Sequence, residues 1–391
     1  MQYRQFGKFD WDVSILGFGA MRLPTVAGKI DEAVATQMLY TAIDQGVNYV
    51  DTAYPYHDGA SEVFVGKALQ REGYRAKVKV ATKMPSWLIN EAADFDKYFD
   101  EQLTRLQMER VDCYLLHALN RDNWPKLQQL GVLEWAERQI AAGRIGHLGF
   151  SFHDDYPTFE AIVNAYAWEF CQIQYNYMDI DRQAGTKGLQ LAASKGMAVI
   201  VMEPVLGGNL ANPPQPIAAL WEQAEHQRAP VDWALQWVWH HPEVTMLLSG
   251  VSSPQQIAEN LQSADKAGIN SLTAQELAII AQVREKYREL RPIPCTQCGY
   301  CLPCPNHVMI PYNFDIYNKG SMFANHAGAR GEYGWLAHRL TLGMVEHDDR
   351  AAACIQCGEC DSKCPQQIPI SQWMPVVHRV LGEGQPFQTA L

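Results

Sequence analysis

The sequence has no long uninterrupted apolar segment. Its longest apolar stretch, residues 198–205, is broken by Glu203 and Pro204, whereas a membrane-spanning helix needs roughly 20 apolar residues. The first residues, MQYRQFGKFDWD, also lack the apolar core that is typical of a secretory signal. We therefore expect no membrane insertion and a cytoplasmic location.

Basic residues are in the minority. Lys and Arg number 32 against 43 Asp and Glu, so the formal net charge is −11 and the pI is about 5.5. This acidic balance argues against a nucleic-acid partner, which requires a basic binding face. The proportions of apolar and charged residues, 47% and 19%, are those of an ordinary globular protein. A chain of 391 residues exceeds the usual size of a single hydrophobic core, which predicts two domains.

Cysteine is almost absent from the first 294 residues. Only Cys113 and Cys171 occur there, each inside an apolar run that predicts a core position. The other eight cysteines lie between Cys295 and Cys364. Because a disulfide framework is out of place in a cytoplasmic protein, this concentration predicts metal ligation.

The first 290 residues alternate short apolar runs with amphipathic segments, the pattern of β/α units. Strands are predicted at 14–18, 48–51, 78–82, 111–116, 147–151, 170–174, 198–202 and 245–248. Helices are predicted between them, among others at 32–45, 61–70, 95–107, 128–142, 158–166 and 186–195. Nearly unbroken apolar strands such as VDCYLL fit a parallel sheet buried on both faces.

Eight such units predict an α/β fold of the TIM-barrel type over residues 1–290. A doubly wound sheet is the structural alternative, but no G-x-G-x-x-G motif follows the first predicted strand. A helix over 273–290 ends at the segment RPIPC, where a smaller domain begins. This domain, residues 291–391, is expected to be mainly α-helical and ferredoxin-like, with a helical segment at 334–345 between its two cysteine motifs.

The two cysteine motifs are C-x-x-C-x-x-C-x-x-C-P from Cys295 and C-x-x-C-x-x-C-x-x-x-C-P from Cys354. Three cysteines two residues apart let one turning backbone present three thiolates to a cubane, and the cysteine before proline usually reaches the other cluster. Two [4Fe–4S] clusters are therefore predicted. The expected ligands are Cys295, Cys298, Cys301 and Cys364 for one cluster, and Cys304, Cys354, Cys357 and Cys360 for the other.

Two alternatives stay open for the cysteine motifs. Zinc also binds four thiolates, although typically from separated C-x-x-C pairs. The first motif has two residues before its last cysteine, where the second has three. A domain with a single cluster, in which Cys304 is not a ligand, is therefore the second alternative.

Four side chains at the predicted strand ends form a candidate catalytic group. Asp51, Lys83 and His117 end the second, third and fourth predicted strands, and Tyr56 lies five residues after Asp51. Taken singly, each has a purely structural explanation. Asp51 could cap a turn, Lys83 could be a solvated lysine, and His117 could be a hydrogen-bonded histidine of the core. Active sites of TIM barrels lie at the carboxyl ends of the strands, so their joint placement favours a catalytic site.

These residues lie in motifs that resemble the aldo-keto reductase family. The matching stretches are D-T-A-x-x-Y…G-x-S-E from Asp51, the strand-ending Lys83, L-L-H at 115–117, GRIGHLGFS at 143–151 and I-A-E-N at 257–260. The resemblance covers roughly residues 3–265, and the cysteine motifs make it similar to an iron–sulfur branch with a ferredoxin-type domain. It implies an oxidoreductase with a tetrad of Asp51, Tyr56, Lys83 and His117.

The tetrad supplies a proton donor for a carbonyl. Tyr56 is neutral at pH 7, and the Lys83 cation is expected to favour the phenolate and lower its pKa. Asp51 would hold Lys83, and His117 would orient the carbonyl by hydrogen bonding. Tyr54 is the competing tyrosine, but only Tyr56 has the family's spacing from Asp51.

The resemblance also implies a nicotinamide site, which matches less well. The expected contacts are Ser151, Gln172, Gly207 in the 204–208 loop, and Asn260. The family's carboxamide-binding Asn and its stacking Tyr align with Phe152 and Met202, and the two cations that hold an adenosine 2′-phosphate align with Gly250 and Gln256. We therefore expect NAD(P)H as cofactor, without a large preference for NADPH.

The predicted function is an oxidoreductase that acts on a small-molecule carbonyl or alcohol. Clusters carry one electron each whereas nicotinamide transfers two as hydride, so the clusters are expected to exchange electrons with a redox protein partner, with a flavin as one option for a carrier between them. The alternative is that the clusters are structural or form a docking module. The barrel would then work as an ordinary NAD(P)H reductase or would not be catalytic.

Overall fold

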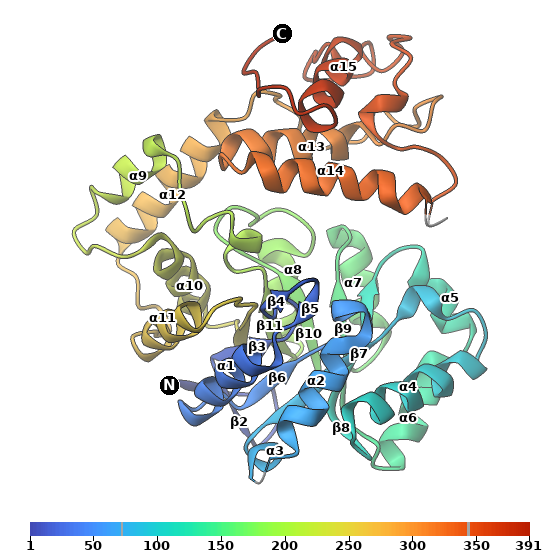
Figure 1. The fold of residues 1–391 in the computed structure, drawn as a ribbon, viewed down its shortest axis with the longest axis vertical. Helices are drawn as coiled ribbons and strands as arrows, with labels where there is room; N and C mark the ends of the chain where they lie inside the picture. The colour runs from blue at the N-terminus through green and yellow to red at the C-terminus, as the bar shows by residue number, and fades with distance from the viewer. Residues whose placement is uncertain (72, 342–344) are drawn as a thin grey trace. The chain divides into compact units, whose positions relative to one another are not determined.

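The computed structural model describes residues 1–71, 73–341 and 345–391 (Figure 1). The chain forms two compact units. The barrel unit comprises Met1–Gly208 and Val231–Ala274, and the helical unit comprises Asn209–Pro230 and Gln275–Leu391. Each unit has buried residues of its own at its centre.

A closed barrel of parallel strands forms the centre of the barrel unit. Its strands follow one another in the order β10-β11-β12-β3-β6-β7-β8-β9. In chain order they are β3 (Leu16–Gly19), β6 (Tyr49–Asp51), β7 (Lys79–Met84), β8 (Val111–Leu119), β9 (Ile145–Phe152), β10 (Phe170–Gln174), β11 (Ala198–Met202) and β12 (Met246–Ser249). The predicted TIM barrel is confirmed, and the doubly wound alternative is wrong.

The barrel interior is filled by apolar side chains from several strands, among them Ala81, Leu115 and Ile200. A hairpin of β1 (Tyr3–Gln5) and β2 (Asp12–Ser14) adds Phe6, whose ring stacks on Trp11 at 4.3 Å. Cys113 and Cys171 are both buried, as the sequence predicts. A second short hairpin, β4 (Thr25–Val26) and β5 (Lys29–Ile30), follows β3.

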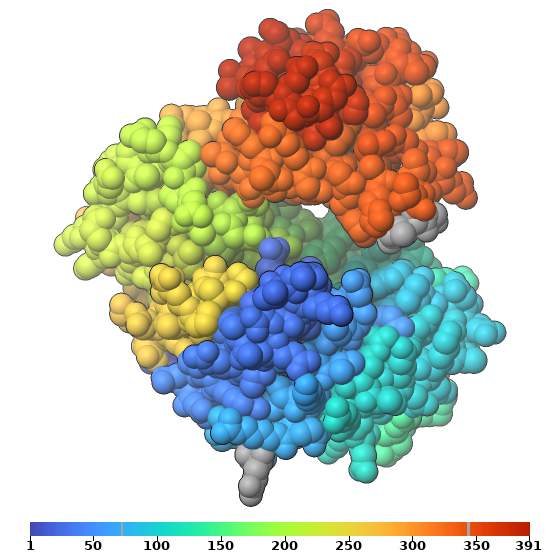
Figure 2. All heavy atoms as spheres, in the orientation of Figure 1, coloured from blue at the N-terminus to red at the C-terminus, as the bar shows by residue number. Residues whose placement is uncertain are grey.

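Helices surround the strands. They are α1 (Glu32–Asp44), α2 (Ala60–Leu69), α3 (Tyr74–Lys77), α4 (Ala93–Leu106), α5 (Asn123–Gln129), α6 (Val132–Ala141), α7 (Tyr156–Ala165), α8 (Gly185–Ser194), α10 (Pro230–His240) and α11 (Pro254–Asp265). Figure 2 shows the blue and cyan parts of the chain, which include α1, α2 and α4, as a continuous surface on the face in view. The helix predicted at 128–142 is two helices, because the chain turns at Gly131 with φ 79°.

The helical unit contains α9 (Gln215–Trp221), α12 (Ala274–Glu289), α13 (Ile310–Met322), α14 (His326–Thr341) and α15 (Ile370–Leu381). The last three helices pack on one another around buried Phe314, Tyr317, Tyr333 and Met374. The helix predicted at 334–345 is the carboxyl-terminal half of α14, which begins earlier, and residues 342–344 lie outside the described residues. Among the described residues, no helix is both long and apolar enough to cross a membrane.

Candidate active site and cysteine-lined hollows

A buried ion pair lies at the carboxyl ends of β6 and β7. Asp51 and Lys83 are 2% and 0% exposed, and Lys83 Nζ lies 2.5 Å from Asp51 Oδ1. Buried charges need further hydrogen bonds. Lys83 therefore also donates to the Thr52 carbonyl at 2.9 Å, and the Gln172 amide donates to Asp51 Oδ2 at 2.6 Å. Although burial disfavours the cation, the Asp51 carboxylate raises the pKa of Lys83, which stays charged.

Tyr56 lies beside this ion pair in the short 3₁₀ turn η1 (Tyr56–Gly59) that follows β6. Its hydroxyl accepts a hydrogen bond from Lys83 Nζ at 3.3 Å, and Nζ lies 4.8 Å from the ring centroid. Burial raises the pKa of Tyr56 and outweighs the lowering effect of Lys83. The net direction is opposite to the expectation from the sequence, because the expectation left out burial. The phenol therefore keeps its proton at neutral pH.

His117 lies beside Tyr56, in an irregular part of the sheet. The pairing of β8 with β9 shifts register between Leu116 and Leu119, a β-bulge of the kind that re-aims side chains near active sites. The His117 ring meets the Tyr56 ring edge-on, with centroids 6.1 Å apart. Burial, followed by the Lys83 charge, holds the pKa of His117 well below its usual range, so the imidazole is neutral.

The competing tyrosine, Tyr54, faces a different set of side chains. Its hydroxyl donates to Glu101 at 3.1 Å, and the Arg105 guanidinium lies 4.1 Å from its ring centroid. Both partners belong to α4, outside the group formed by Asp51, Lys83 and His117. The structure thus brings Tyr56, but not Tyr54, into contact with the candidate lysine.

A buried polar network that could not be predicted from the sequence supports the end of β7. Gln102 of α4 donates to the Lys83 carbonyl at 3.0 Å and to Glu62 at 2.7 Å, and it accepts from the Tyr114 hydroxyl at 2.7 Å. Thr82 also donates to Glu62, at 2.6 Å. The only signal in the sequence was Glu62 itself, in the G-x-S-E stretch.

The residues expected at the nicotinamide site lie at the same end of the barrel, and three have partners within the protein. Ser151 Oγ accepts from the Ala118 backbone N–H at 2.8 Å, within the β8 bulge. The Asn260 amide donates to Ser249 Oγ at 2.7 Å, and Gln172 contacts the tetrad as described. Gly207 lies in a left-handed turn with φ 64°.

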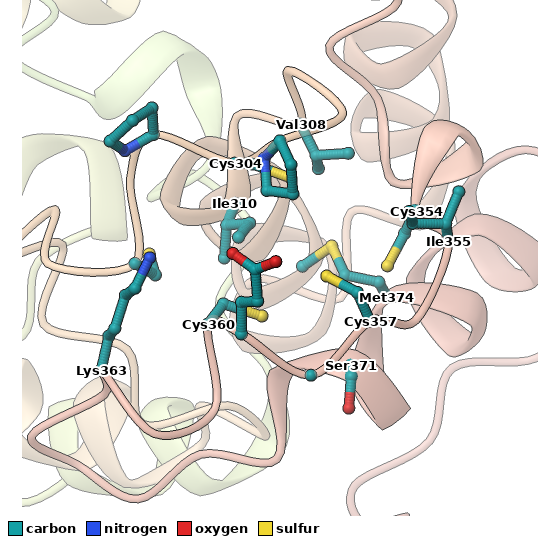
Figure 3. A pocket seen from close by; sticks show the side chains of 15 residues that line it. Cys304, Val308, Ile310, Cys354, Ile355, Cys357, Cys360, Lys363, Ser371 and Met374 are labelled. Atoms are coloured by element: carbon teal, nitrogen blue, oxygen red, sulfur yellow. The ribbon is translucent and has the colours of Figure 1, made fainter.

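Two hollows in the helical unit are lined by cysteines. The first is lined by Cys295, Cys298, Cys301 and Cys364. The second is lined by Cys304, Cys354, Cys357 and Cys360, and also by Cys301 (Figure 3). In Figure 3, Cys354, Cys357 and Cys360 follow one loop and Cys304 comes from another. Each hollow therefore combines three cysteines of one motif with the last cysteine of the other.

The chemistry of both hollows fits an iron–sulfur cluster. Apolar side chains line the walls beside the thiols, Phe314 and Ile368 in one hollow and Val308 and Met374 in the other, with Ile310 lining both. Glu359, Lys363 and Ser371 also line the second hollow. Four thiolates are the ligands that a [4Fe–4S] cluster takes.

The two cysteine loops repeat one local geometry. The backbone N–H of Gln297 points at Cys295 Sγ and that of Gln356 at Cys354 Sγ, both at 3.4 Å. The glycine after the second cysteine has φ 78° in each loop, a left-handed turn that favours glycine. A helix follows each motif, α13 after the first and α15 after the second, so the two segments share the order of cysteine loop and helix.

Comparison with known families matches each part of the chain to a family model. Residues 15–285 match the model described as the Aldo/keto reductase family. Residues 294–368 match the model described as a 4Fe-4S dicluster domain. The first match covers well over half of the chain and includes the four tetrad residues, and the second includes all eight clustered cysteines.

Individual relatives resemble the barrel part. L-galactose dehydrogenase of Arabidopsis thaliana is 26% identical over 320 residues, covering 74% of this chain and 96% of the relative. NADH-specific methylglyoxal reductase of Escherichia coli is 25% identical, covering 65% and 91%. The solved structure of an aldo-keto reductase from Bacillus halodurans in its holo form is 29% identical with a TM-score of 0.61, covering 72% and 96%.

Proposed function

The chain belongs to the aldo/keto reductase family of oxidoreductases and carries a 4Fe-4S domain, and on this basis we propose that it reduces a small-molecule carbonyl, or oxidises the corresponding alcohol, with Tyr56 as the acid. The observation that supports this most strongly is the hydrogen-bonded series Tyr56–Lys83–Asp51. It lies at the barrel end where such active sites are found. Of the relatives, one is named a reductase and another a dehydrogenase, which fits a reaction that runs in either direction.

In the reduction direction, Tyr56 donates its phenolic proton to the carbonyl oxygen. Its hydroxyl accepts from Lys83, so its own proton is left to donate to the substrate. Lys83 stabilises the phenolate that remains, and Asp51 keeps Lys83 charged and in place. Neutral His117 donates a hydrogen bond that orients the carbonyl. A bound nicotinamide would supply the hydride for the carbonyl carbon, and the proton from Tyr56 would complete the alcohol.

The barrel residues fit a nicotinamide dinucleotide. Ser151 and Gln172 would hold the carboxamide, because Gln172 contacts Asp51 of the tetrad and Ser151 contacts the backbone N–H of Ala118, the residue after His117. Gly207 and Gly208, with φ 64° and 95°, leave a turn without side chains that would admit the pyrophosphate. Asn260, held near the end of β12 by Ser249, would contact the adenine.

Replacing Tyr56 tests this function. Tyr56→Phe removes the donated proton and keeps the ring, so kcat is expected to fall by about 10²–10⁴-fold, the usual contribution of general acid catalysis. The fold, by circular dichroism, and NAD(P)H affinity should be unchanged. Tyr54→Phe is the matched control, because its partners lie on α4. Near-normal turnover of Tyr56→Phe with loss in Tyr54→Phe would assign the acid to Tyr54. The assays use a panel of carbonyl substrates under strict anaerobiosis.

The second part of the proposal is that the eight cysteines hold two [4Fe–4S] clusters that exchange electrons with a redox protein partner. Each cluster carries one electron, so two clusters together match the two electrons of one hydride. The dicluster match and the two cysteine-lined hollows support this number. A bound flavin is one carrier that would divide a hydride into single electrons.

Cluster absorbance distinguishes an electron-transfer role from a structural one. NADH or NADPH is added to anaerobically purified protein, and the visible absorbance is recorded. Bleaching supports exchange of electrons between the barrel cofactor and the clusters. Turnover of a carbonyl with unchanged cluster absorbance would instead support structural clusters or a docking module.

A further inference from the structure

Arg22 extends from the carboxyl end of one barrel strand across two others. It follows β3, and its side chain lies against Gly250, the residue after β12. A Cβ at Gly250 would lie 3.4 Å from Arg22 Cδ, and a Cβ at Gly207, in the loop after β11, would lie 3.3 Å from Arg22 Nη2. Because β11, β12 and β3 are consecutive in the barrel, the guanidinium spans the ends of three adjacent strands.

The Arg22 guanidinium is exposed and has no ion pair or hydrogen bond among the described residues. Arginine offers five N–H donors in a fixed planar arrangement. The backbone beside it is a left-handed turn that includes two glycines, since Leu206, Gly207 and Gly208 have φ 48°, 64° and 95°. A cation with free donors therefore lies next to a backbone surface without side chains, which a bound anion can approach closely.

We propose that Arg22 binds a phosphate group of the nicotinamide dinucleotide. In TIM barrels, phosphate sites frequently form at the loops that follow the last two strands, which here are β11 and β12. The guanidinium fork matches phosphate oxygens with two parallel hydrogen bonds. This inference rests on the proposed use of a nicotinamide cofactor, and it names the residue that grips it.

Gly250 and Arg22 are two parts of one arrangement. A Cβ at position 250 would lie in van der Waals contact with the stem of Arg22, so a longer side chain there would start beside the Arg22 side chain. Gln256 does not replace the missing cation, because its Oε1 accepts from the Ser252 backbone N–H at 2.8 Å. The expectation of little preference for NADPH rests on the missing cations at positions 250 and 256, and under this proposal Arg22 supplies a cation from the loop after β3.

Calorimetric titration of the full chain, with its clusters, tests this inference. NADPH and NADH are titrated into the unmodified protein, Arg22→Gln and the control Arg110→Gln, which alters an exposed arginine before the amino end of β8. Arg22→Gln should weaken binding of at least one nucleotide tenfold or more, and the difference should shrink at high salt because charge interactions are screened. A loss confined to NADPH places the adenosine 2′-phosphate at Arg22, and an equal loss for both nucleotides places the pyrophosphate there.

A rescue variant shows whether the position of the cation matters. Adding Gly250→Lys to Arg22→Gln returns a cation to the same space from β12, and affinity should recover. Unchanged affinity in Arg22→Gln, with normal Tyr56-dependent turnover, overturns this inference and leaves the proposed function intact. If the unmodified protein binds neither nucleotide, this inference and the cofactor of the proposed function fail together, whereas the role of Tyr56 is still decided by its own variant.

Discussion

In the candidate active site, burial and the neighbouring charges set the protonation state of each residue. The same enclosure that keeps His117 neutral raises the pKa of Tyr56, while the Asp51 carboxylate keeps Lys83 charged. A protonated phenol, a neutral imidazole and a cationic lysine are the states that proton donation to a carbonyl requires. All three exist together near neutral pH.

The pH dependence of turnover follows from the Tyr56 phenol. Its pKa is raised above the ordinary value of 10.0, and reduction needs the protonated form. The kcat for reduction is expected to stay flat from about pH 6 to about pH 9 and to fall as the pH rises through the raised pKa. Alcohol oxidation needs the phenolate and should accelerate over that same alkaline range. Rates in both directions test this, and a reduction rate that halves near neutrality would show that a different acid is at work.

At the residue scale, the sequence predicts which side chains meet but not their surroundings. Asp51, Lys83 and His117 could be placed because each ends an apolar strand, and Tyr56 because of its spacing from Asp51. The sign of the Tyr56 pKa shift could not be predicted, since it depends on how much protein encloses the phenol. Arg22 was missed for a similar reason, because its position beside Gly207 exists only after the barrel closes.

At the scale of the elements, the Gln102 side chain links α4 to β7 through hydrogen bonds. Gln102→Leu would leave the buried Glu62 carboxylate short of a donor and release the Lys83 carbonyl. The variant is expected to lose about 1–3 kcal/mol of unfolding free energy, the cost of an unsatisfied buried polar group, and to lower kcat by displacing Lys83. Urea unfolding and steady-state kinetics measure the two effects. Gln37→Leu, on the exposed face of α1, is the control. Equal stability of the two variants would show that the network contributes nothing.

The elements themselves were largely predictable from apolar patterning. The strands β10 and β11 have the predicted bounds, because each is an apolar run between polar neighbours. The bulge in β8 could not be predicted, since it is a property of the pairing with β9 and not of either strand alone. The amino-terminal half of α14 was missed because its residues, HAGARGEY, show no apolar stripe.

For the whole molecule, metal content is the first measurement. Anaerobically purified protein is expected to be brown and to contain about eight irons per chain, four for each cubane. Cys304→Ala should lower the iron content, whereas Cys113→Ala, in the barrel core, should not. Colourless protein with stoichiometric zinc would contradict the cluster assignment. About four irons in the unmodified protein would favour a single cluster.

The two-part organisation was predictable from the change in cysteine content after residue 294. The residues that belong to each unit were less predictable. The segment Asn209–Pro230 groups with the helical unit, although it lies between β11 and α10 in the sequence. Nothing in that segment's own composition indicates this. Its grouping depends on contacts with residues far away in the sequence.

The two cysteine segments depend on each other. Each segment lends its last cysteine to the hollow that the other segment lines. A lone segment would therefore offer three thiols to one hollow, and its last cysteine would have no site of its own. Neither segment can supply four thiolates to a cluster alone, so damage to either segment is expected to impair both sites.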